Sequence, residues 1–282
     1  MLPEFRMPIA IYKAAGRCRA IFLAGFCLAV LCGCQPAGPK ALLLGAKYID
    51  EGDFPEALRH LNKAAEIMPA HPQVWNHLGL AWHGSKEPAR AAEAYSRALK
   101  IDQRLPAPHF NLGMLLLEEG RLNEAIAALS TFVSLEPTNA LGYSKLGTAL
   151  VQARRTDEAE RALNQALRLN PKDAEAHNNL GLVHVQRKRA RDAMLEFNEA
   201  LEDRPNYPAA LLNQAVVAQV YFGRADMAIE RYQAFVHSSP SDRLKPEVNN
   251  LIRQLEESRR VPAEPPPPKP REFDIPPATN AV

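Results

Sequence analysis

The stretch NNLGLVHVQRKRARDAMLEFNEALEDRP, residues 178–205, contains each element of a pattern that recurs along the chain. It holds a Leu-Gly pair, and such pairs stand 34 residues apart at Leu44-Gly45, Leu78-Gly79, Leu112-Gly113, Leu146-Gly147 and Leu180-Gly181. The same step relates the alanines Ala57, Ala91, Ala125, Ala159 and Ala193. It also relates the large side chains Leu61, Tyr95, Leu129, Leu163 and Phe197. Several columns at one fixed period indicate stacked copies of a single unit.

Each column has a physical role in a hairpin of two helices. Glycine at the eighth position of the unit and alanine at the twentieth lack bulky side chains, so they let the two helices approach closely. Proline closes most units, at Pro69, Pro137, Pro171 and Pro205, because it cannot continue the preceding helix. One hairpin cannot bury its apolar faces alone. Stacking must bury them, and stability then becomes a sum of nearest-neighbour interactions.

The period and its columns resemble the tetratricopeptide repeat. The resemblance covers residues 38–241 and implies an all-α, right-handed superhelical solenoid of about six hairpins. We expect these hairpins at residues 38–71, 72–105, 106–139, 140–173, 174–207 and 208–241. The sixth unit departs from the pattern because Ala215 replaces the glycine and one residue is inserted near residues 220–222. A π-bulge or a longer first helix is the expected way to absorb it.

Two further segments follow the repeats. Residues 242–260 are expected to form a capping helix over the last repeat, because five apolar residues fall on one helical face: Leu244, Val248, Leu251, Ile252 and Leu255. Residues 261–282 contain eight prolines in 22 residues. That composition buries too little apolar surface to fold, so it predicts an extended, polyproline-like, disordered tail.

All the cysteines lie near the N-terminus, at Cys18, Cys27, Cys32 and Cys34. Residues 21–31, IFLAGFCLAVL, form an apolar run of eleven residues after the basic segment IYKAAGRCR. The run is shorter than the roughly 20 residues that span a bilayer. This order predicts a secretory signal peptide over residues 1–33. The alternatives are a short buried helix or an uncleaved membrane anchor.

The run Leu31-Cys32-Gly33-Cys34 resembles the lipobox of bacterial lipoproteins. The resemblance implies that the Cys34 thiol receives a diacylglyceryl group, that the peptide is cut before Cys34, and that the new amino group is acylated, for example with palmitate. Residues 34–37 would then be a lipidated anchor and short linker. Two or three acyl chains hold a protein stably on a membrane, whereas one does not. Gln35 after the cysteine favours the outer membrane of a bacterial envelope, with the protein facing the periplasm.

Composition and motifs point away from catalysis and from nucleic acid. The formal net charge is +2, and residues 1–33 carry +3 of it, which leaves about −1 for the rest. There is no phosphate-cradling glycine loop and no nucleophile elbow in the sequence. His177 and His184 would stand about 10 Å apart along one helix, too far to share a metal. We predict no enzyme, no catalytic residue, no metal, no cofactor and no small-molecule substrate, and keep the regulatory arm of an enzyme as an alternative.

The repeat resemblance implies that the first helices line a concave groove. Position 6 of the units faces it and reads His77, Asn111, Lys145, Asn179 and Asn213. An asparagine amide both donates and accepts hydrogen bonds, so these residues could hold the backbone of an extended peptide. This resembles the asparagine ladder in the repeat superhelix of the O-linked N-acetylglucosamine transferase. Alternatively, the asparagines bond only within the fold.

Apolar residues are expected beside this row: Leu80, Met114 and Leu182 at position 9, and Phe110 at position 5 as an aromatic anchor. Such a surface suits an extended or helical partner segment.

The whole layout resembles bacterial envelope lipoproteins built of these repeats, namely type IV pilus pilotins, tight-adherence pilus assembly lipoproteins and the NlpI group. It implies a lipid-anchored scaffold that binds a partner protein or peptide through its groove during envelope complex assembly. A role specifically in pilus or secretin assembly is one alternative. A cytosolic-facing adaptor with an uncleaved N-terminal segment is another.

Overall fold

The computed structural model describes residues 36–238 and 243–260. The predicted signal peptide over residues 1–33, the lipidation site Cys34 and the predicted tail over residues 261–282 lie outside the described residues.

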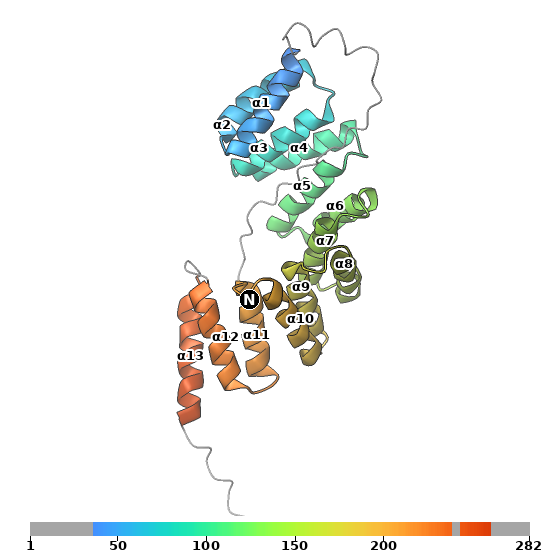
Figure 1. Cartoon of the computed structure of the whole chain (residues 1–282). Coiled ribbons are helices and arrows are strands. Elements are labelled where there is room, and N and C mark those ends of the chain that lie inside the picture. The colour runs from blue at the N-terminus through green and yellow to red at the C-terminus, as the bar shows by residue number, and fades with distance from the viewer. Residues whose placement is uncertain (1–35, 239–242, 261–282) are drawn as a thin grey trace, which may run out of the picture.

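The described residues form thirteen helices and no strand. The first twelve pair in chain order into six helical hairpins, which stack along the length of the molecule (Figure 1). The predicted all-α repeat solenoid is therefore confirmed. The hairpins are α1 (Ala37–Glu51) with α2 (Phe54–Ile67), α3 (Pro72–Gly84) with α4 (Pro88–Ile101), α5 (Pro106–Glu118) with α6 (Leu122–Leu135), α7 (Ala140–Gln152) with α8 (Thr156–Leu169), α9 (Ala174–Gln186) with α10 (Ala190–Asp203), and α11 (Pro208–Val220) with α12 (Ala225–Ser238).

The glycine and alanine columns lie where the two helices of a hairpin touch. A Cβ added at Gly79 would lie 2.4 Å from the ring of Tyr95, and one at Gly181 would lie 2.4 Å from the ring of Phe197. The eighth position of the unit is therefore filled by the side chain of the twenty-fourth. The alanines of the twentieth position are fully buried from Ala57 to Ala193. Close helix contact explains why both columns contain small residues.

Each hairpin reverses through a residue in the left-handed backbone region. These residues are Gly52, Lys86, Gly120, Arg154, Lys188 and Gly223, with φ between 58° and 77°. Nothing lies within 4 Å of a Cβ added at the three glycines, so glycine is present for its backbone freedom and not for space.

The extra residue of the sixth unit enlarges this turn. Helix α11 has 13 residues, as α9 has, but residues 221–224 connect α11 to α12 whereas three residues connect α9 to α10. The expectation of a π-bulge or a longer first helix is wrong. Lengthening α11 would shift the register of its buried residues Ala215 and Ala218 relative to α12, whereas a surface turn accepts an added residue at little cost.

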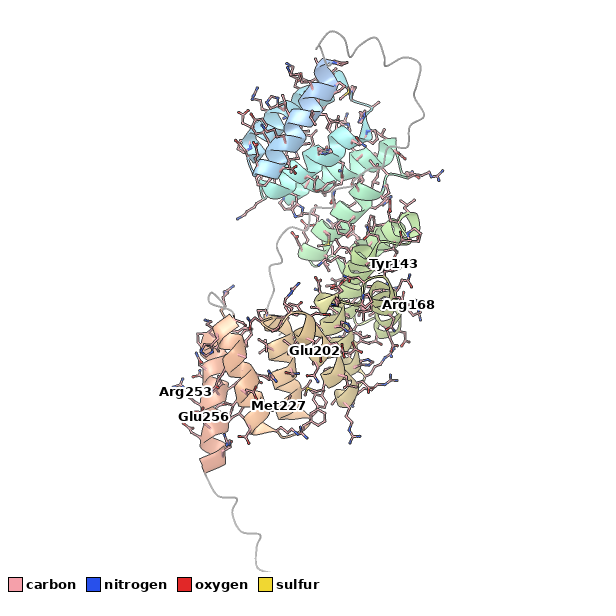
Figure 2. All side chains as sticks on the ribbon, viewed as in Figure 1. Tyr143, Arg168, Glu202, Met227, Arg253 and Glu256 are labelled. Atoms are coloured by element: carbon pink, nitrogen blue, oxygen red, sulfur yellow. The ribbon has the colours of Figure 1, made fainter. Side chains whose placement is uncertain are left out.

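The last helix, α13 (Lys245–Arg260), lies beside α12 at the C-terminal end of the stack (Figure 1). Val248 and Ile252 of α13 are buried in one apolar cluster with Tyr232 and Phe235 of α12. Arg253 and Glu256 of α13 mark this end of the molecule in Figure 2. None of the described helices combines the length and apolarity needed to cross a lipid bilayer.

Candidate partner-binding surface

The position-6 asparagines bond to side chains of the preceding hairpin. Asn111 Nδ2 donates to Asn76 Oδ1 at 3.0 Å, and Asn213 Nδ2 donates to Asn178 Oδ1 at 2.9 Å. Asn179 Nδ2 donates to Thr148 Oγ1 at 2.8 Å. The first helices of successive repeats are thus linked through these amides. Each of these amides therefore uses one N–H in a hydrogen bond within the fold, as the alternative prediction stated.

Lys145, the position-6 residue of α7, forms a buried ion pair. Its Nζ lies 2.7 Å from both carboxylate oxygens of Glu175 in α9. The Lys145 side chain is 5% exposed and that of Glu175 is 21% exposed. Burying a charged group costs free energy unless the charge is paired, so the carboxylate of Glu175 helps to offset the cost of burying the Lys145 ammonium group.

Neighbouring contacts join this ion pair to the amides. The Thr148 hydroxyl lies 3.3 Å from Oε1 of Glu175 and accepts the bond from Asn179. We call the connected side chains from α7 to α11 the polar network. It comprises Lys145, Thr148, Glu175, Asn178, Asn179 and Asn213. Glu175 and Asn213 are its partly exposed members and are therefore the ones that a ligand can contact.

His77 holds position 6 in α3 and stands apart from the polar network. Its Nδ1 lies 2.7 Å from the carbonyl oxygen of Gln73, one helical turn earlier. Burial lowers the pKa of His77, because the charged ring would lose solvation. The ring is therefore neutral at pH 7, and its Nδ1–H donates a hydrogen bond to that carbonyl oxygen.

Three of the four apolar residues that were predicted to line the groove are buried. Phe110 has no exposed area, and its ring lies 5.0 Å from that of Phe132, tilted by 57°. Met114 is 3% exposed and Leu80 is 7% exposed. The expectation that these residues line an open groove is wrong, because the stacked hairpins pack tightly enough to cover positions 5 and 9. Leu182 in α9 is half-buried and stays accessible.

Other apolar residues of the first helices are accessible, namely Leu43 on α1 at 61%, Leu141 on α7 at 40%, and a cluster at the end of α11. Val216 is 39% exposed and Val220 is 67% exposed, both on α11. Tyr221 and Phe222 in the following turn are 44% and 36% exposed. Sequence reasoning missed this cluster. The available indication was that no seventh repeat follows to cover an apolar position 9.

Charged residues of the second helices pair on the surface. Arg121 holds Glu124 at 2.6 Å and Arg155 holds Glu158 at 2.6 Å, each pair three residues apart. His177 lies 2.8 Å from Glu196 of the same hairpin. Across the described residues, no group of three or more His, Cys, Asp and Glu side chains is placed to hold a metal ion.

A stack of six helical hairpins with small residues at every crossing defines a helical repeat solenoid. A family model described as tetratricopeptide repeat matches residues 42–106 and 144–208, and a second model of the same description matches residues 107–139. Together these matches cover more than half of the chain. The chain belongs to the tetratricopeptide repeat family.

Solved structures share this fold. The chain is similar to the structure of pilF from Pseudomonas aeruginosa, with a TM-score of 0.64 and 23% identity over 76% of this chain and 97% of that one. It is similar to MamA, with a TM-score of 0.53 and 25% identity over 58% of this chain and 95% of that one. YrrB, described as a TPR protein with an unusual peptide-binding site, matches with a TM-score of 0.54 and 21% identity over 67% of this chain and 97% of that one.

A curated relative matches over a shorter span. The peroxisomal targeting signal receptor of Saccharomyces cerevisiae is 26% identical over 98 residues, which is 35% of this chain. The match spans 16% of the receptor's own length.

Proposed function

We propose that this chain is a lipid-anchored scaffold that binds a segment of a partner protein on the first helices α9 and α11. Tetratricopeptide repeats act as scaffolds for protein–protein interaction, and such scaffolds are generally not enzymes. The observation that carries the proposal is that Leu182 and Asn213, like Glu175, are partly exposed on these neighbouring helices. At the same repeat positions as Leu182 and Asn213, the residues Leu80, Met114 and Asn111 of α3 and α5 are buried. Polar groups next to an apolar side chain suit a peptide, which offers both kinds of group.

An extended segment is the partner that fits this surface. The carboxylate of Glu175 accepts hydrogen bonds, and the amide of Asn213 offers donor and acceptor groups to a peptide backbone. Each such bond contributes only about 0.5–1.5 kcal/mol, so binding must draw on several together with apolar contact at Leu182.

Photo-crosslinking tests where the partner binds. A crosslinking amino acid is placed at position 182 or 213 in the full membrane-bound chain. The matched control is position 195 on α10, where Leu195 is 63% exposed. Covalent partner adducts are expected from positions 182 and 213 and not from position 195, and mass spectrometry then identifies the partner. Equal labelling from position 195 overturns the proposed site.

The lipid anchor is a separate part of the proposal. It is supported by the lipobox-like run that ends at Cys34. Only Gln35 and Pro36 separate Cys34 from α1, which spans Ala37–Glu51. The three residue steps from Cys34 to Ala37 reach at most about 10 Å, so the first hairpin would lie close against the membrane. Cys34→Ser should abolish palmitate labelling and membrane fractionation, while Cys32→Ser should retain both. Labelling that persists in Cys34→Ser contradicts the anchor.

We propose the periplasmic side of a bacterial outer membrane as the location, on the basis of the signal-like segment and of Gln35 after the cysteine. Protease added to spheroplasts should then digest the repeats. Digestion only after the cells are opened favours the cytosolic-facing adaptor instead.

Pilus or secretin assembly is one envelope process that this scaffold would serve. Its support is the combination of six hairpins with a lipobox-like run, which is the layout of the pilotins that the sequence resembles. The likeness to pilF is one of fold. Recovery of a secretin subunit in the crosslinking experiment would support this process, and recovery only of cell-wall enzymes or proteases would exclude it.

A further inference from the structure

One face of α11 is apolar and uncovered. Val216 occupies position 9 of its repeat and is 39% exposed, whereas Leu80 and Met114 occupy the same position and are 7% and 3% exposed. Leu212, Val216 and Val220 follow one another at steps of four, so they lie on one side of the helix. We call these three residues, with Tyr221 and Phe222 of the next turn, the α11 strip.

The strip is uncovered because α13 is placed differently from the first helix of a repeat. Each of α1, α3, α5, α7 and α9 contacts the first helix of the following hairpin. Helix α13 lies beside α12, and within the described residues none of its Cα atoms comes within 8 Å of a Cα atom of α11. The apolar face of α13 packs against α12, where Val248 and Ile252 are buried. The place that the first helix of a seventh repeat would take beside α11 is left open.

The chain leaves α13 next to this strip. Arg259, one residue before the end of α13, lies 2.6 Å from Asp226 in the first turn of α12. Asp226 is the second residue of α12, which begins directly after the turn of residues 221–224. In Figure 1 the end of α13 and the turn between α11 and α12 lie at the same end of the last hairpin. The described part of α13 therefore ends at the same end of the last hairpin as the turn of residues 221–224.

The sequence after Arg260 has the chemistry to cover an apolar and aromatic surface. Residues 261–282 read VPAEPPPPKPREFDIPPATNAV and include four consecutive prolines and the apolar residues Phe273 and Ile275. Proline-rich segments are already extended before they bind, so they lose little conformational entropy on binding. Such segments dock on aromatic-lined surfaces. Phe273 and Ile275 are two residues apart and stand between the proline runs, so a β-type extended backbone at these residues would put both side chains on the same side.

The connecting chain is long enough. Twelve residues lie between Arg260 and Phe273, which makes thirteen residue steps. At about 3.1 Å per residue in an extended proline-rich chain they reach roughly 40 Å. Helix α11, with 13 residues, is about 20 Å long. Phe273 can thus reach every residue of the α11 strip.

We propose that residues 261–282 dock on the α11 strip of the same chain, with Phe273 and Ile275 against Val216 and Val220 and the prolines near Tyr221 and Phe222. Because the segment is tethered beside its site, its effective concentration is in the millimolar range, and a weak contact is enough to hold it. This docking does not depend on partner binding at α9 and α11.

Crosslinking from the tail tests the proposal in the full chain. A photo-reactive phenylalanine analogue replaces Phe273, and the crosslinked residues are mapped by mass spectrometry. The expected result is crosslinking within one chain to residues 212–222, with a yield that stays constant on about tenfold dilution. The double variant Val216→Asp with Val220→Asp should lower this yield about tenfold or more.

Leu195→Asp is the matched control, because Leu195 is also exposed and apolar but lies on α10. It should leave the yield unchanged. Crosslinks to a second copy whose yield falls on dilution, crosslinks only to another protein, or crosslinks that avoid residues 212–222 each overturn the proposal. Adducts from positions 182 and 213 report on the partner site separately, so failure of one proposal is distinguishable from failure of the other.

Discussion

Gly147 of α7 packs directly onto Leu163 of α8, so that a Cβ added at Gly147 would lie 2.5 Å from Cδ2 of Leu163. The same relationship joins Gly45 to Leu61, where the distance would be 2.4 Å. Real Cβ atoms do not approach other atoms so closely. The eighth and twenty-fourth positions of the repeat are therefore constrained as a pair, and the size of one limits the size of the other.

Replacing this glycine should separate the two helices of its hairpin. We expect Gly147→Val to lower the free energy of unfolding by about 3 kcal/mol, because overpacking forces side chains and backbone to move. Chemical denaturation followed by circular dichroism measures the change. Gln152→Val is the control, since Gln152 is exposed on the same helix and carries the same β-branched penalty. Equal losses in the two variants would show that packing on Leu163 is not the cause.

The Lys145–Glu175 pair should matter more to stability than surface ion pairs do. Glu175→Gln removes the charge that compensates buried Lys145, and we expect a loss of about 3 kcal/mol in the free energy of unfolding. Arg155 and Glu158 form a comparably short pair, but their side chains are 41% and 42% exposed. Glu158→Gln should therefore cost no more than about 1 kcal/mol. A cost in Glu175→Gln as small as that in Glu158→Gln would mean that the charge of Lys145 does not depend on Glu175 for compensation.

His177 should make the stability of the fifth hairpin depend on pH. Its hydrogen bond to Glu196, with Nδ1 2.8 Å from Oε2, raises the pKa of His177. A pKa that is higher in the folded state than in the unfolded state means that the pair stabilises the fold fully below the unfolded value of about 6.5. That stabilisation is lost as the pH rises through the folded-state pKa of His177.

Glu196→Gln is the variant that isolates this effect. It should lower the pKa of His177 measured by NMR titration, and it should reduce the gain in unfolding free energy between pH 8 and pH 5.5. His77 serves as an internal reference, because burial lowers its pKa and the variant leaves its surroundings unchanged. A His177 titration that does not move in Glu196→Gln contradicts the assignment.

The hairpins could be predicted from the sequence because their information is local and repeated. The Leu-Gly, alanine and large-residue columns describe contacts between two helices about sixteen residues apart, and the same contact appears in successive units. The turn that absorbs the extra residue of the sixth unit was also foreseeable. The left-handed positions recur from Gly52 to Lys188 at the same step of 34, and Gly223 stands one residue late in that series.

The openness of the groove could not be predicted in the same way, because it depends on how closely successive hairpins stack. Position 5 is fully buried at Phe110 but half-buried at Leu212. Phe132 illustrates the reason. A large residue where the family usually has alanine suggests wider spacing, yet a Cβ added at Gly142 would lie 2.4 Å from its ring. Gly142 in the following helix, α7, leaves room for the large ring of Phe132, so the hairpins still stack closely. No single column of the repeat contains that information.

The amide links between repeats should contribute to cooperativity along the stack. Asn111 is 3% exposed, and its replacement by alanine would leave Oδ1 of buried Asn76 without this donor. We expect Asn111→Ala to lower the free energy of unfolding by about 1–3 kcal/mol. Hydrogen exchange should become faster in α1 to α4 than in α9 to α12, because the second and third hairpins are uncoupled. Asn206→Ala, at an exposed turn position, should change neither quantity. Uniformly faster exchange in Asn111→Ala would instead show that this hydrogen bond stabilises the whole solenoid as one unit.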